Sequence, residues 1–284
     1  MDNILVTVII TTYDRPADLS RALSSVVNQT YKNLEILVID GKGLQETLEV
    51  IKKFKSKDKR ITWICALVGK KTSKLYGSVQ QARNIGLRYA SGKYVALLDD
   101  DDTWESDKIA IQLYHAEIFN AALTSCYMKI QGENHIDKPS LTPKYEDLLK
   151  NFNMSCTSSY FLNRKILKRI GGFNESLRSM HEYDIALKLA RRGYEIGVVP
   201  LPLITVNRDN AKKREFYYIK IAEVFDLYRF YGKDMLLYLG VRGFLFNIIK
   251  SGLLVTLFLL GFIFKEKIWG VIFKLKNLYQ EKSE

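Results

Sequence analysis

The sequence predicts an α/β protein with a mostly parallel sheet of the nucleotide-binding type, flanked by helices. The first observation is a set of strand-length runs that are almost entirely apolar or β-branched, such as VTVIITT and EILVID. Such runs are typical of strands that are buried on both faces of a sheet. The second observation is that a segment with apolar residues at helical spacing follows each run. The third is that three of the runs lead directly into aspartates, at the sheet edge where ligands of such folds collect.

The first 120 residues follow this alternation of strand and helix from one end to the other. After the first run, Leu19, Ala22, Leu23 and Val26 recur at helical spacing, which indicates an amphipathic helix packed on the sheet. The predicted strands are Val6–Thr12, Leu34–Asp40, Ile61–Leu67 and the run from Tyr94 to Asp100, and the predicted helices are Ala17–Gln29, Leu44–Phe54, Ser78–Tyr89 and Glu105–Asn120.

The pattern is less regular from residue 121 to residue 209, which we assign to the second half of the same domain. We expect strands at Leu123–Ile130 and Ser158–Leu162, then a turn at Gly171-Gly172-Phe173, then a helix in the segment HEYDIALKLARRGY. Because the acidic strand ends lie in residues 1–120, we expect residues 121–209 to supply a second-substrate site beside the same sheet.

Residues 210–284 form a helical, basic and apolar C-terminal extension. They contain 13 Lys/Arg and 7 Asp/Glu, half of the net charge of +12. After an expected helix from Lys213 to Tyr231, the run Ser251–Phe264 has fourteen residues without a charge, fewer than the roughly 20 that a spanning helix needs. Its basic and aromatic flanks favour a helical tail that associates with an anionic membrane surface. The alternative is a helical hairpin buried on the protein or in a homodimer interface.

The cysteines and the N-terminus indicate a cytoplasmic protein. Three cysteines without metal-ligand spacing are typical of reduced thiols, and the first residues lack the basic region and cleavage site of a signal peptide. Together with the tail, they predict a protein on the inner face of the cell membrane. The basic residues lie around an apolar tail and not in an aromatic-studded groove, so we expect no nucleic-acid partner.

Four consecutive aspartates, Asp99 to Asp102, follow the buried run YVALL. Adjacent negative charges repel one another and resist desolvation unless a cation lies among them. Hard divalent cations such as Mg²⁺ and Mn²⁺ take oxygen ligands and are commonly shared between carboxylates and a substrate's phosphates. We therefore expect Asp99 and Asp101 to hold a divalent cation. For Asp102 we favour a plainer role, as the cap of a helix that starts near Trp104.

Taken in order, the motifs VTVIITTYDRP, EILVID, QQARNIGL, SGKYVALLDDDDTW, GGFNESL and HEYDIALKLARRGY resemble those of the family 2 glycosyltransferases of GT-A fold, over roughly Val6 to Pro202. The resemblance implies a nucleotide-sugar half at 1–120 and an acceptor half at 121–209. The C-terminal extension lies outside it, although such extensions occur in bacterial surface-polysaccharide members of the family.

The resemblance also implies roles on the donor side. Thr11, Thr12, Tyr13 and Asp14 match the loop that lines the nucleotide pocket, although many relatives have Asn in place of Asp14. Asp40 matches the residue that binds the nucleotide base, although Gly41-Lys42-Gly43 follows where relatives often have a second acid. Arg83 matches a residue beneath the donor. Two interpretations of Arg83 are equally open: it pairs with the diphosphate, or it is a surface arginine on an amphipathic helix. Asp99 and Asp101 match a D-x-D metal site with Asp100 at its variable position.

On the acceptor side, Glu182 matches the general base and Asp184 is the second candidate, while His181 is expected to be a neighbour without that role. Without the resemblance, both acids read as favourable charges at a helix start. The implied activity is inverting transfer from a nucleotide-diphosphate sugar, expected to be UDP-linked, to a saccharide acceptor carried on a polyprenyl diphosphate, in surface-polysaccharide synthesis. The alternatives are a non-catalytic nucleotide-sugar binding module and a sugar nucleotidyltransferase.

Overall fold

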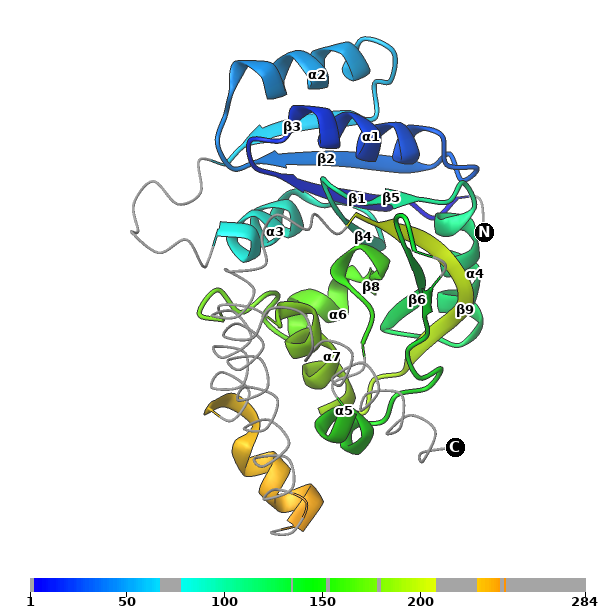
Figure 1. Cartoon of the computed structure of the whole chain (residues 1–284), viewed down its shortest axis with the longest axis vertical. Coiled ribbons are helices and arrows are strands. Elements are labelled where there is room, and N and C mark those ends of the chain that lie inside the picture. The colour runs from blue at the N-terminus through cyan, green and yellow to red at the C-terminus, as the bar shows by residue number, and fades with distance from the viewer. Residues whose placement is uncertain are drawn as a thin grey trace, which may run out of the picture. The chain divides into compact units, whose positions relative to one another are not determined.

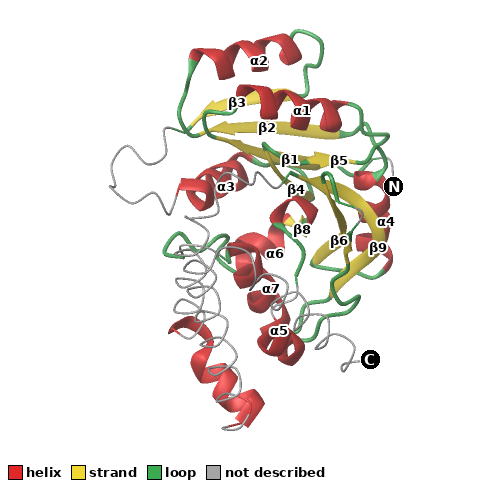
Figure 2. Ribbon diagram, in the orientation of Figure 1, coloured by secondary structure: helices red, strands yellow, loops and turns green. Residues whose placement is uncertain are grey.

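The computed structural model describes residues 3–66, 78–133, 135–151, 154–177, 180–207, 229–240 and 243. The chain divides into two compact units, Met1–Arg208 and Asp209–Glu284. The first unit contains the sheet and all of the predicted site residues (Figures 1 and 2).

Four parallel strands make up the half of the sheet that the sequence predicts best. They are β1 (Val6–Thr12), β2 (Leu34–Asp40), β3 (Ile61–Cys65) and β4 (Tyr94–Asp99), and they lie in the order β3-β2-β1-β4. All pairings among them are parallel. The predicted parallel arrangement of these strands is therefore confirmed, and β1, the first strand in sequence, lies inside the sheet.

Helices cover both faces of this parallel half. Helices α1 (Pro16–Val27) and α2 (Gln45–Lys55) lie on one side of the strands and α3 (Ser78–Tyr89) lies on the other (Figure 1). The fourth predicted helix is α4 (Lys108–Ile118), which begins three residues later than expected from Glu105.

The core follows from the alternation of side chains along β1. Val6, Val8 and Ile10 are fully buried in one cluster with the apolar residues of α1, because alternate residues of a strand point to the same face. Ile9 points to the opposite face, where a Cβ added to Gly86 of α3 would lie 2.6 Å from its Cγ2 atom. Only a glycine allows α3 to approach the sheet this closely, which explains that position in the ARNIG segment.

The second half of the sheet is mixed, so the expectation of a mostly parallel sheet is corrected. The remaining strands are β5 (Thr103–Trp104), β6 (Leu123–Ile130), β7 (Ile136–Asp137), β8 (Phe161–Asn163) and β9 (Ile196–Val206), of which β6 is the strand predicted with these bounds. Strand β8 is antiparallel to both β4 and β6, β9 is parallel to β6, and β5 is antiparallel to β9. The full order is β3-β2-β1-β4-β8-β6-β9-β5, with β7 beside β6.

Short helices fill the remainder of the first unit. They are α5 (Tyr145–Asn151), the 3₁₀ turn η1 (Thr157–Ser159), α6 (Arg164–Arg169) and α7 (His181–Arg191). The strand expected at Ser158–Leu162 is therefore wrong in its first half, because Ser158 and Ser159 belong to η1. Helix α7 confirms the helix expected in the HEYD segment, and Met180 before it has a left-handed backbone, with φ 57°.

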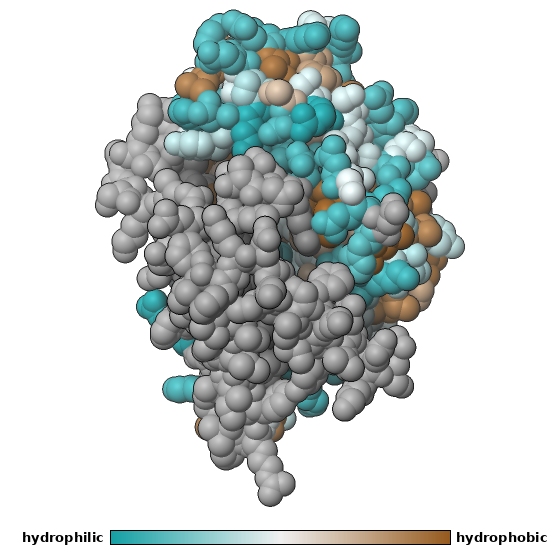
Figure 3. Space-filling view, viewed as in Figure 1, coloured by the Kyte–Doolittle hydropathy of each residue, from teal (hydrophilic) through white to brown (hydrophobic). Residues whose placement is uncertain are grey.

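Exposed apolar side chains gather on α4. Tyr114, Ile118 and Phe119 at the end of this helix are each more than half exposed, and Figure 3 shows hydrophobic residues gathered in the region of α4 and β9, whereas hydrophilic residues dominate over α1 and α2. No helix within the described ranges is long and apolar enough to cross a membrane.

In the second unit, residues 229–240 are helical. They overlap the end of the helix expected at Lys213–Tyr231, of which residues 213–228 lie outside the described residues. The uncharged run Ser251–Phe264, on which the membrane-associating tail depends, also lies outside them, so the tail stays a prediction.

Candidate active site

The carboxyl ends of three adjacent strands meet at one edge of the sheet. In the strand register Thr12 of β1 lies beside Asp40 of β2, and Thr11 of β1 lies beside Asp99 of β4. The loop Tyr13-Asp14-Arg15 begins between these two acidic strand ends. The structure thus brings the predicted residues of the nucleotide pocket and of the metal site together, at the position where such sheets bind ligands.

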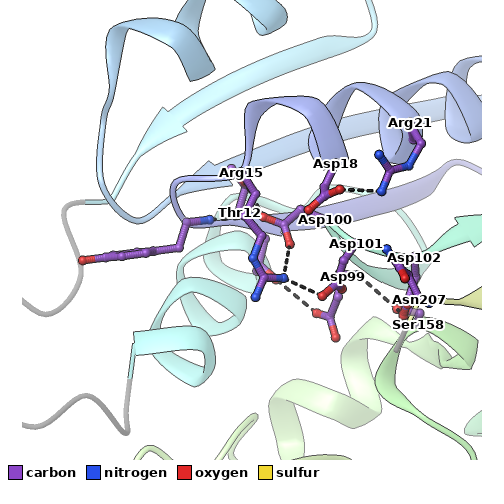
Figure 4. A network of polar contacts seen from close by, with 12 residues as sticks. Thr12, Arg15, Asp18, Arg21, Asp99, Asp100, Asp101, Asp102, Ser158 and Asn207 are labelled. Atoms are coloured by element: carbon purple, nitrogen blue, oxygen red, sulfur yellow. Dashed lines mark hydrogen bonds and ion pairs between the residues drawn. The ribbon is translucent and has the colours of Figure 1, made fainter. Parts of the chain in front are cut away.

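The four aspartates differ in burial and alternate along the chain. The side chains of Asp99 and Asp101 are 32% exposed, whereas Asp100 and Asp102 are 5% exposed. Figure 4 shows them together with the basic and hydroxyl side chains around them. Two of the aspartates are therefore available to a ligand, and the other two hold the loop in place.

Arg15 neutralises the middle of the acidic run. Its Nη1 atom lies 2.5 Å from Asp101 Oδ2 and 3.3 Å from Asp100 Oδ1 (Figure 4). The second oxygen of Asp100 accepts hydrogen bonds from the Thr12 hydroxyl at 2.8 Å and from the Tyr13 N–H at 3.3 Å. Burial raises the pKa of Asp100 to about 6, although Thr12 and Arg15 oppose the shift. Asp100 thus ties the β4 end to the loop after β1.

Asp99 is paired with Arg83 of α3. Arg83 is 2% exposed and donates from Nη2 to Asp99 Oδ1 over 2.6 Å, and the Thr11 hydroxyl donates to the same oxygen at 3.3 Å. Burial alone would raise the pKa of Asp99, but the Arg83 guanidinium holds it below its ordinary value. The Arg83 guanidinium also lies 5.7 Å from the centre of the Phe173 ring. Arg83 is therefore a buried partner of the acidic strand end and not a surface residue.

Asp102 does not cap a helix, so that expectation is wrong. Helix α4 begins only at Lys108, and Asp102 is instead buried, accepting hydrogen bonds from the Ser158 hydroxyl at 2.5 Å and from the Asn207 N–H at 3.2 Å. Burial, together with the charge of Asp99, raises the pKa of Asp102 to about 8. The Ser158 oxygen also accepts the Asp99 N–H at 3.1 Å. Ser158 thus fixes both ends of the acidic run.

Asp40 is fully buried at the end of β2. One oxygen accepts the N–H groups of Lys42 and Gly43 at 3.0 and 2.9 Å, and the other lies 3.4 Å from the indole nitrogen of Trp63. Its carboxylate therefore shapes the turn at Gly41-Lys42-Gly43. The hydrogen bond between Asp40 and the base of the nucleotide stays a prediction.

Asp14 and Tyr13 are exposed in the loop after β1. Asp14 has a left-handed backbone, with φ 60°, and its side chain forms an ion pair with Lys42. The Lys42 ammonium lies 5.8 Å from the centre of the Tyr13 ring, which is half exposed. An exposed aromatic ring with a cation beside it can contact a planar heterocycle.

Helix α7 carries both acidic residues that the sequence offers as the general base, Glu182 and Asp184, in its first turn. Glu182 is 30% exposed on its side chain and lies 3.4 Å from the Nε2 atom of His181. Asp184 is 4% exposed and is paired with Lys188 one turn later at 2.7 Å. Of the two candidate bases, Glu182 is the one that a substrate can reach. The charges of Arg83 and Asp99 both act on the pKa of His181. The start of α7 is therefore close enough to the acidic strand end for these charges to be felt there.

The oxygen ligands that Asp99 and Asp101 offer suit a hard divalent cation. Asp99 and Asp101 present carboxylate oxygens at an exposed edge, and oxygen ligands of this type suit Mg²⁺ or Mn²⁺ when a diphosphate supplies the remaining oxygens. Among the described residues no group of three or more His, Cys, Asp or Glu is arranged to hold a metal ion by itself. The cation site at Asp99 and Asp101 stays a prediction, in which a substrate diphosphate supplies the remaining oxygen ligands.

Several residues of the site were missed by the sequence reasoning. Arg15 pairs with two of the aspartates, Ser158 connects two others, and Gln80 contacts His181. Arg15 could have been found, because an arginine beside an acidic strand end is a natural counter-charge. Ser158 and Gln80 carry no such signal, since their partners are far away in the sequence.

Comparison with known proteins identifies the family. The model of glycosyl transferase family 2 matches residues 7–173, more than half of the chain. WfgD of Escherichia coli, described as a UDP-Glc:alpha-D-GlcNAc-diphosphoundecaprenol beta-1,3-glucosyltransferase, is 32% identical over 170 residues, which are 59% of this chain and 63% of WfgD. WfaP of the same species, with the same described activity, is 32% identical over 188 residues, which are 65% of this chain and 69% of WfaP. The chain thus spans less than two thirds of WfgD.

Solved structures show the same fold. S. aureus TarS 1-349 in complex with UDP-GlcNAc has a TM-score of 0.59 at 16% identity, over 79% of this chain and 67% of that one. The mannosyltransferase PcManGT from Pyrobaculum calidifontis, in complex with GDP-Man and Mn²⁺, has a TM-score of 0.59 at 19% identity, over 81% of this chain and 64% of that one. These likenesses establish a GT-A-like fold. The family model, which matches more than half of the chain, shows that the chain belongs to glycosyl transferase family 2.

Proposed function

We propose that the protein is an inverting glycosyltransferase that uses a nucleotide-diphosphate sugar. The observation that carries the proposal is the presence of two sets of partly exposed carboxylates: those of Asp99 and Asp101 at the strand ends, and that of Glu182 at the start of α7. Glu182 lies 3.4 Å from His181, and the charge of Asp99 acts on the pKa of the same histidine. The first set suits a diphosphate with its cation, and the second suits a hydroxyl acceptor.

On the donor side, Thr11, Tyr13 and Asp14 border the space where the nucleotide would bind. Asp40 and Asp100 are buried beneath it and fix the two loops, and Arg83 holds Asp99. Asp101 and Asp99 would hold Mg²⁺ or Mn²⁺, which supplies positive charge against the diphosphate that leaves. This charge would compete with Arg15 for Asp101.

On the acceptor side, Glu182 accepts the proton of the attacking hydroxyl. The hydroxyl oxygen forms a bond to the anomeric carbon while the bond from that carbon to the diphosphate oxygen breaks, and its electron pair stays on the diphosphate. Attack from the opposite face inverts the anomeric configuration. Asp184 is less suited to this role, because it is buried and paired with Lys188.

The relatives WfgD and WfaP suggest the substrates. Their described activity uses UDP-glucose and a GlcNAc-diphosphoundecaprenol acceptor, so we propose a UDP-sugar donor and a polyprenyl-diphosphate-linked saccharide acceptor, in the assembly of a surface polysaccharide. An acceptor of this kind is carried by the membrane. A basic, apolar C-terminal extension on the inner membrane surface would bring the site to it.

The test is a transfer assay with UDP-glucose and a GlcNAc-diphospho-lipid, run on the wild type, on Glu182→Gln and on Glu49→Gln. Glu49 is an exposed acid on α2 and serves as the matched control. We expect Glu182→Gln to lose at least about 100-fold in kcat while UDP affinity, measured by calorimetry, stays within about twofold. Full activity of Glu182→Gln would overturn the assignment of the base. UDP binding by a wild type that transfers none of a panel of UDP-sugars would favour the non-catalytic binding module.

A further inference from the structure

Gln80 of α3 connects the donor side of the site to the start of α7. Its side chain is 1% exposed. The amide nitrogen Nε2 lies 3.2 Å from the carbonyl oxygen of Leu177 and 2.9 Å from Nδ1 of His181. Within the part of the chain that the structure describes, the buried amide oxygen has no hydrogen-bond partner. Burying an amide oxygen without a hydrogen-bond partner costs free energy. The two contacts of the amide nitrogen must therefore outweigh this cost, which suggests that they have a role.

The Leu177 carbonyl fixes the orientation of the Gln80 amide. A carbonyl oxygen can only accept a hydrogen bond, so the group that faces it must be the NH₂ and not the oxygen of Gln80. The same NH₂ group then donates its second proton to His181. Because Nδ1 of His181 must accept this hydrogen bond, the proton of the neutral imidazole is on Nε2.

The protonated nitrogen of His181 faces the proposed base. Nε2 lies 3.4 Å from Oε2 of Glu182, a contact that is long without substrate and that can shorten when a substrate closes the site. Burial, with the Arg83 charge, lowers the pKa of His181, while Glu182, Asp99 and Asp184 oppose the shift. The ring is therefore neutral at pH 7, which makes the position of its single proton decisive.

We propose that Gln80 is a positioning residue that fixes the Nε2–H tautomer of His181, so that His181 donates to Glu182 and holds its carboxylate for the acceptor. This inference rests on the proposed function, since it needs Glu182 to act as the base. In the other tautomer a bare nitrogen lone pair would face the Glu182 oxygen and repel it. His181 itself takes no proton from the acceptor in this scheme.

The experiment is a double-mutant cycle in which His181 is replaced by a residue that has no tautomers. His181→Gln keeps an N–H donor near the position of Nε2 but has no tautomers, whereas His181→Phe has no donor. Gln80→Leu removes both hydrogen bonds of Gln80. The matched control is Gln81→Leu, at the neighbouring, partly buried position of the same helix. For each variant, kcat, the KM values for donor and acceptor, UDP affinity and thermal stability are measured.

We expect Gln80→Leu and His181→Phe to lose about tenfold or more in kcat, as misplaced catalytic groups do, with UDP affinity within about twofold. We expect His181→Gln to retain activity within about fivefold. In the double variant Gln80→Leu/His181→Gln, we expect no further loss relative to His181→Gln alone.

Two results would overturn the proposal. If Gln80→Leu costs the same kcat in the His181→Gln background as in the wild type, Gln80 acts by holding the Leu177 loop and not through His181. If His181→Phe is fully active while Glu182→Gln is inactive, the proposed base stands and the role of His181 fails. If Glu182→Gln is itself active, it is the proposed function that fails, so the two failures are distinguishable.

Discussion

The side chain of Asn84 forms hydrogen bonds with both the N–H and the C=O of Phe173. The Phe173 N–H donates to Asn84 Oδ1 over 2.9 Å, and Asn84 Nδ2 donates to the Phe173 carbonyl over 2.9 Å. Two segments that are separate in the sequence, ARNIG and GGF, are thus a single structural unit. Arg83, the partner of Asp99, precedes Asn84 in α3, so this unit connects the helix that holds the acidic strand end to the segment that precedes α7 in the sequence.

Replacing Asn84 with Ala should destabilise the protein by about 1–3 kcal/mol, because the main-chain N–H and C=O of the buried residue Phe173 lose the Asn84 side chain as their partner. Arg88→Ala, at an exposed position of the same helix, should change the free energy of unfolding by less than about 0.5 kcal/mol. Denaturant unfolding of the three proteins measures both values. Equal stability of Asn84→Ala and the control would mean that water replaces Asn84 without cost.

Gly172 and Gly171 make a matched pair in the same turn. Both have positive φ, 65° and 90°, but a Cβ on Gly172 would lie 2.8 Å from Asn84 Oδ1, whereas a Cβ on Gly171 would meet no atom of the described residues within 4 Å. Gly171→Ala should therefore cost only the backbone strain of about 1–2 kcal/mol. Gly172→Ala should cost at least about 1 kcal/mol more, since it also displaces Asn84.

Thermal unfolding of the two glycine variants separates these contributions. In an Asn84→Ala background the clash has no partner, so the two glycine substitutions should then cost the same. A difference between them that persists without Asn84 would contradict the steric explanation.

Asp101 should control the metal dependence of nucleotide binding. Asp101→Asn removes one of the two exposed carboxylates, so we expect the Mn²⁺-dependent part of UDP affinity to fall by about tenfold or more, since a neutral amide is a weaker ligand for a hard cation. Asp18→Asn, on α1 and paired with Arg21, is the control, for which we expect no change. Calorimetric titration of UDP, GDP and dTDP with and without Mn²⁺ gives the affinities and also the preferred base. Unchanged metal dependence in Asp101→Asn would exclude Asp101 as a ligand.

Arg15 should weaken cation binding when no nucleotide is present. Its guanidinium lies 2.5 Å from Asp101 Oδ2, where it competes directly with a metal ion. Because Arg15 is about one third exposed and solvent screens its charge, we expect Arg15→Gln to bind Mn²⁺ only about three- to tenfold more tightly than the wild type. Arg15→Lys keeps the charge and should resemble the wild type. Weaker Mn²⁺ binding by Arg15→Gln would show that Arg15 organises the carboxylates more than it blocks them.

The parallel half of the fold was predictable because each of its strands is a continuous apolar run that local sequence alone reveals. Strand β9 was not, since Pro200 and Pro202 argue against an inner strand. The structure accommodates them where the register of β6 shifts between Cys126 and Met128. An irregularity of this kind depends on the partner strand, so the two prolines alone do not reveal that β9 continues past them.

The site shows the same division between local and distant information. The strand-end positions of Asp99 and Asp101 follow from the sequence, and the structure places both at the exposed edge. The burial of Asp100 and Asp102 depends on Thr12 and Ser158, which are more than 50 residues away from them. No local pattern distinguishes a carboxylate that binds a ligand from one that holds a loop.

The buried side chain of Lys108 should make the stability of the protein depend on pH. It is fully buried, with its ammonium 2.5 Å from Gln112 Oε1 and 4.1 Å from the centre of the Trp104 ring. Burial lowers its pKa from 10.5 to about 8, although Cys126 and Cys156 oppose the shift. Between these two pH values the unfolded chain binds a proton at Lys108 that the folded protein does not bind, so the free energy of unfolding should rise with pH in this window.

Lys108→Met removes this titration and leaves the other groups in place. Below pH 8 both states of the wild type are protonated, so the stability difference between the two proteins should be constant there. From pH 8 to pH 10.5 the wild type should gain about 1–3 kcal/mol relative to Lys108→Met, since each pKa unit corresponds to about 1.4 kcal/mol. Chemical unfolding at several pH values measures the difference, in which the titration of Cys126 and of the tyrosines largely cancels. Parallel pH profiles for the two proteins would mean that Lys108 keeps its charge in the core, held by Gln112 and the face of Trp104.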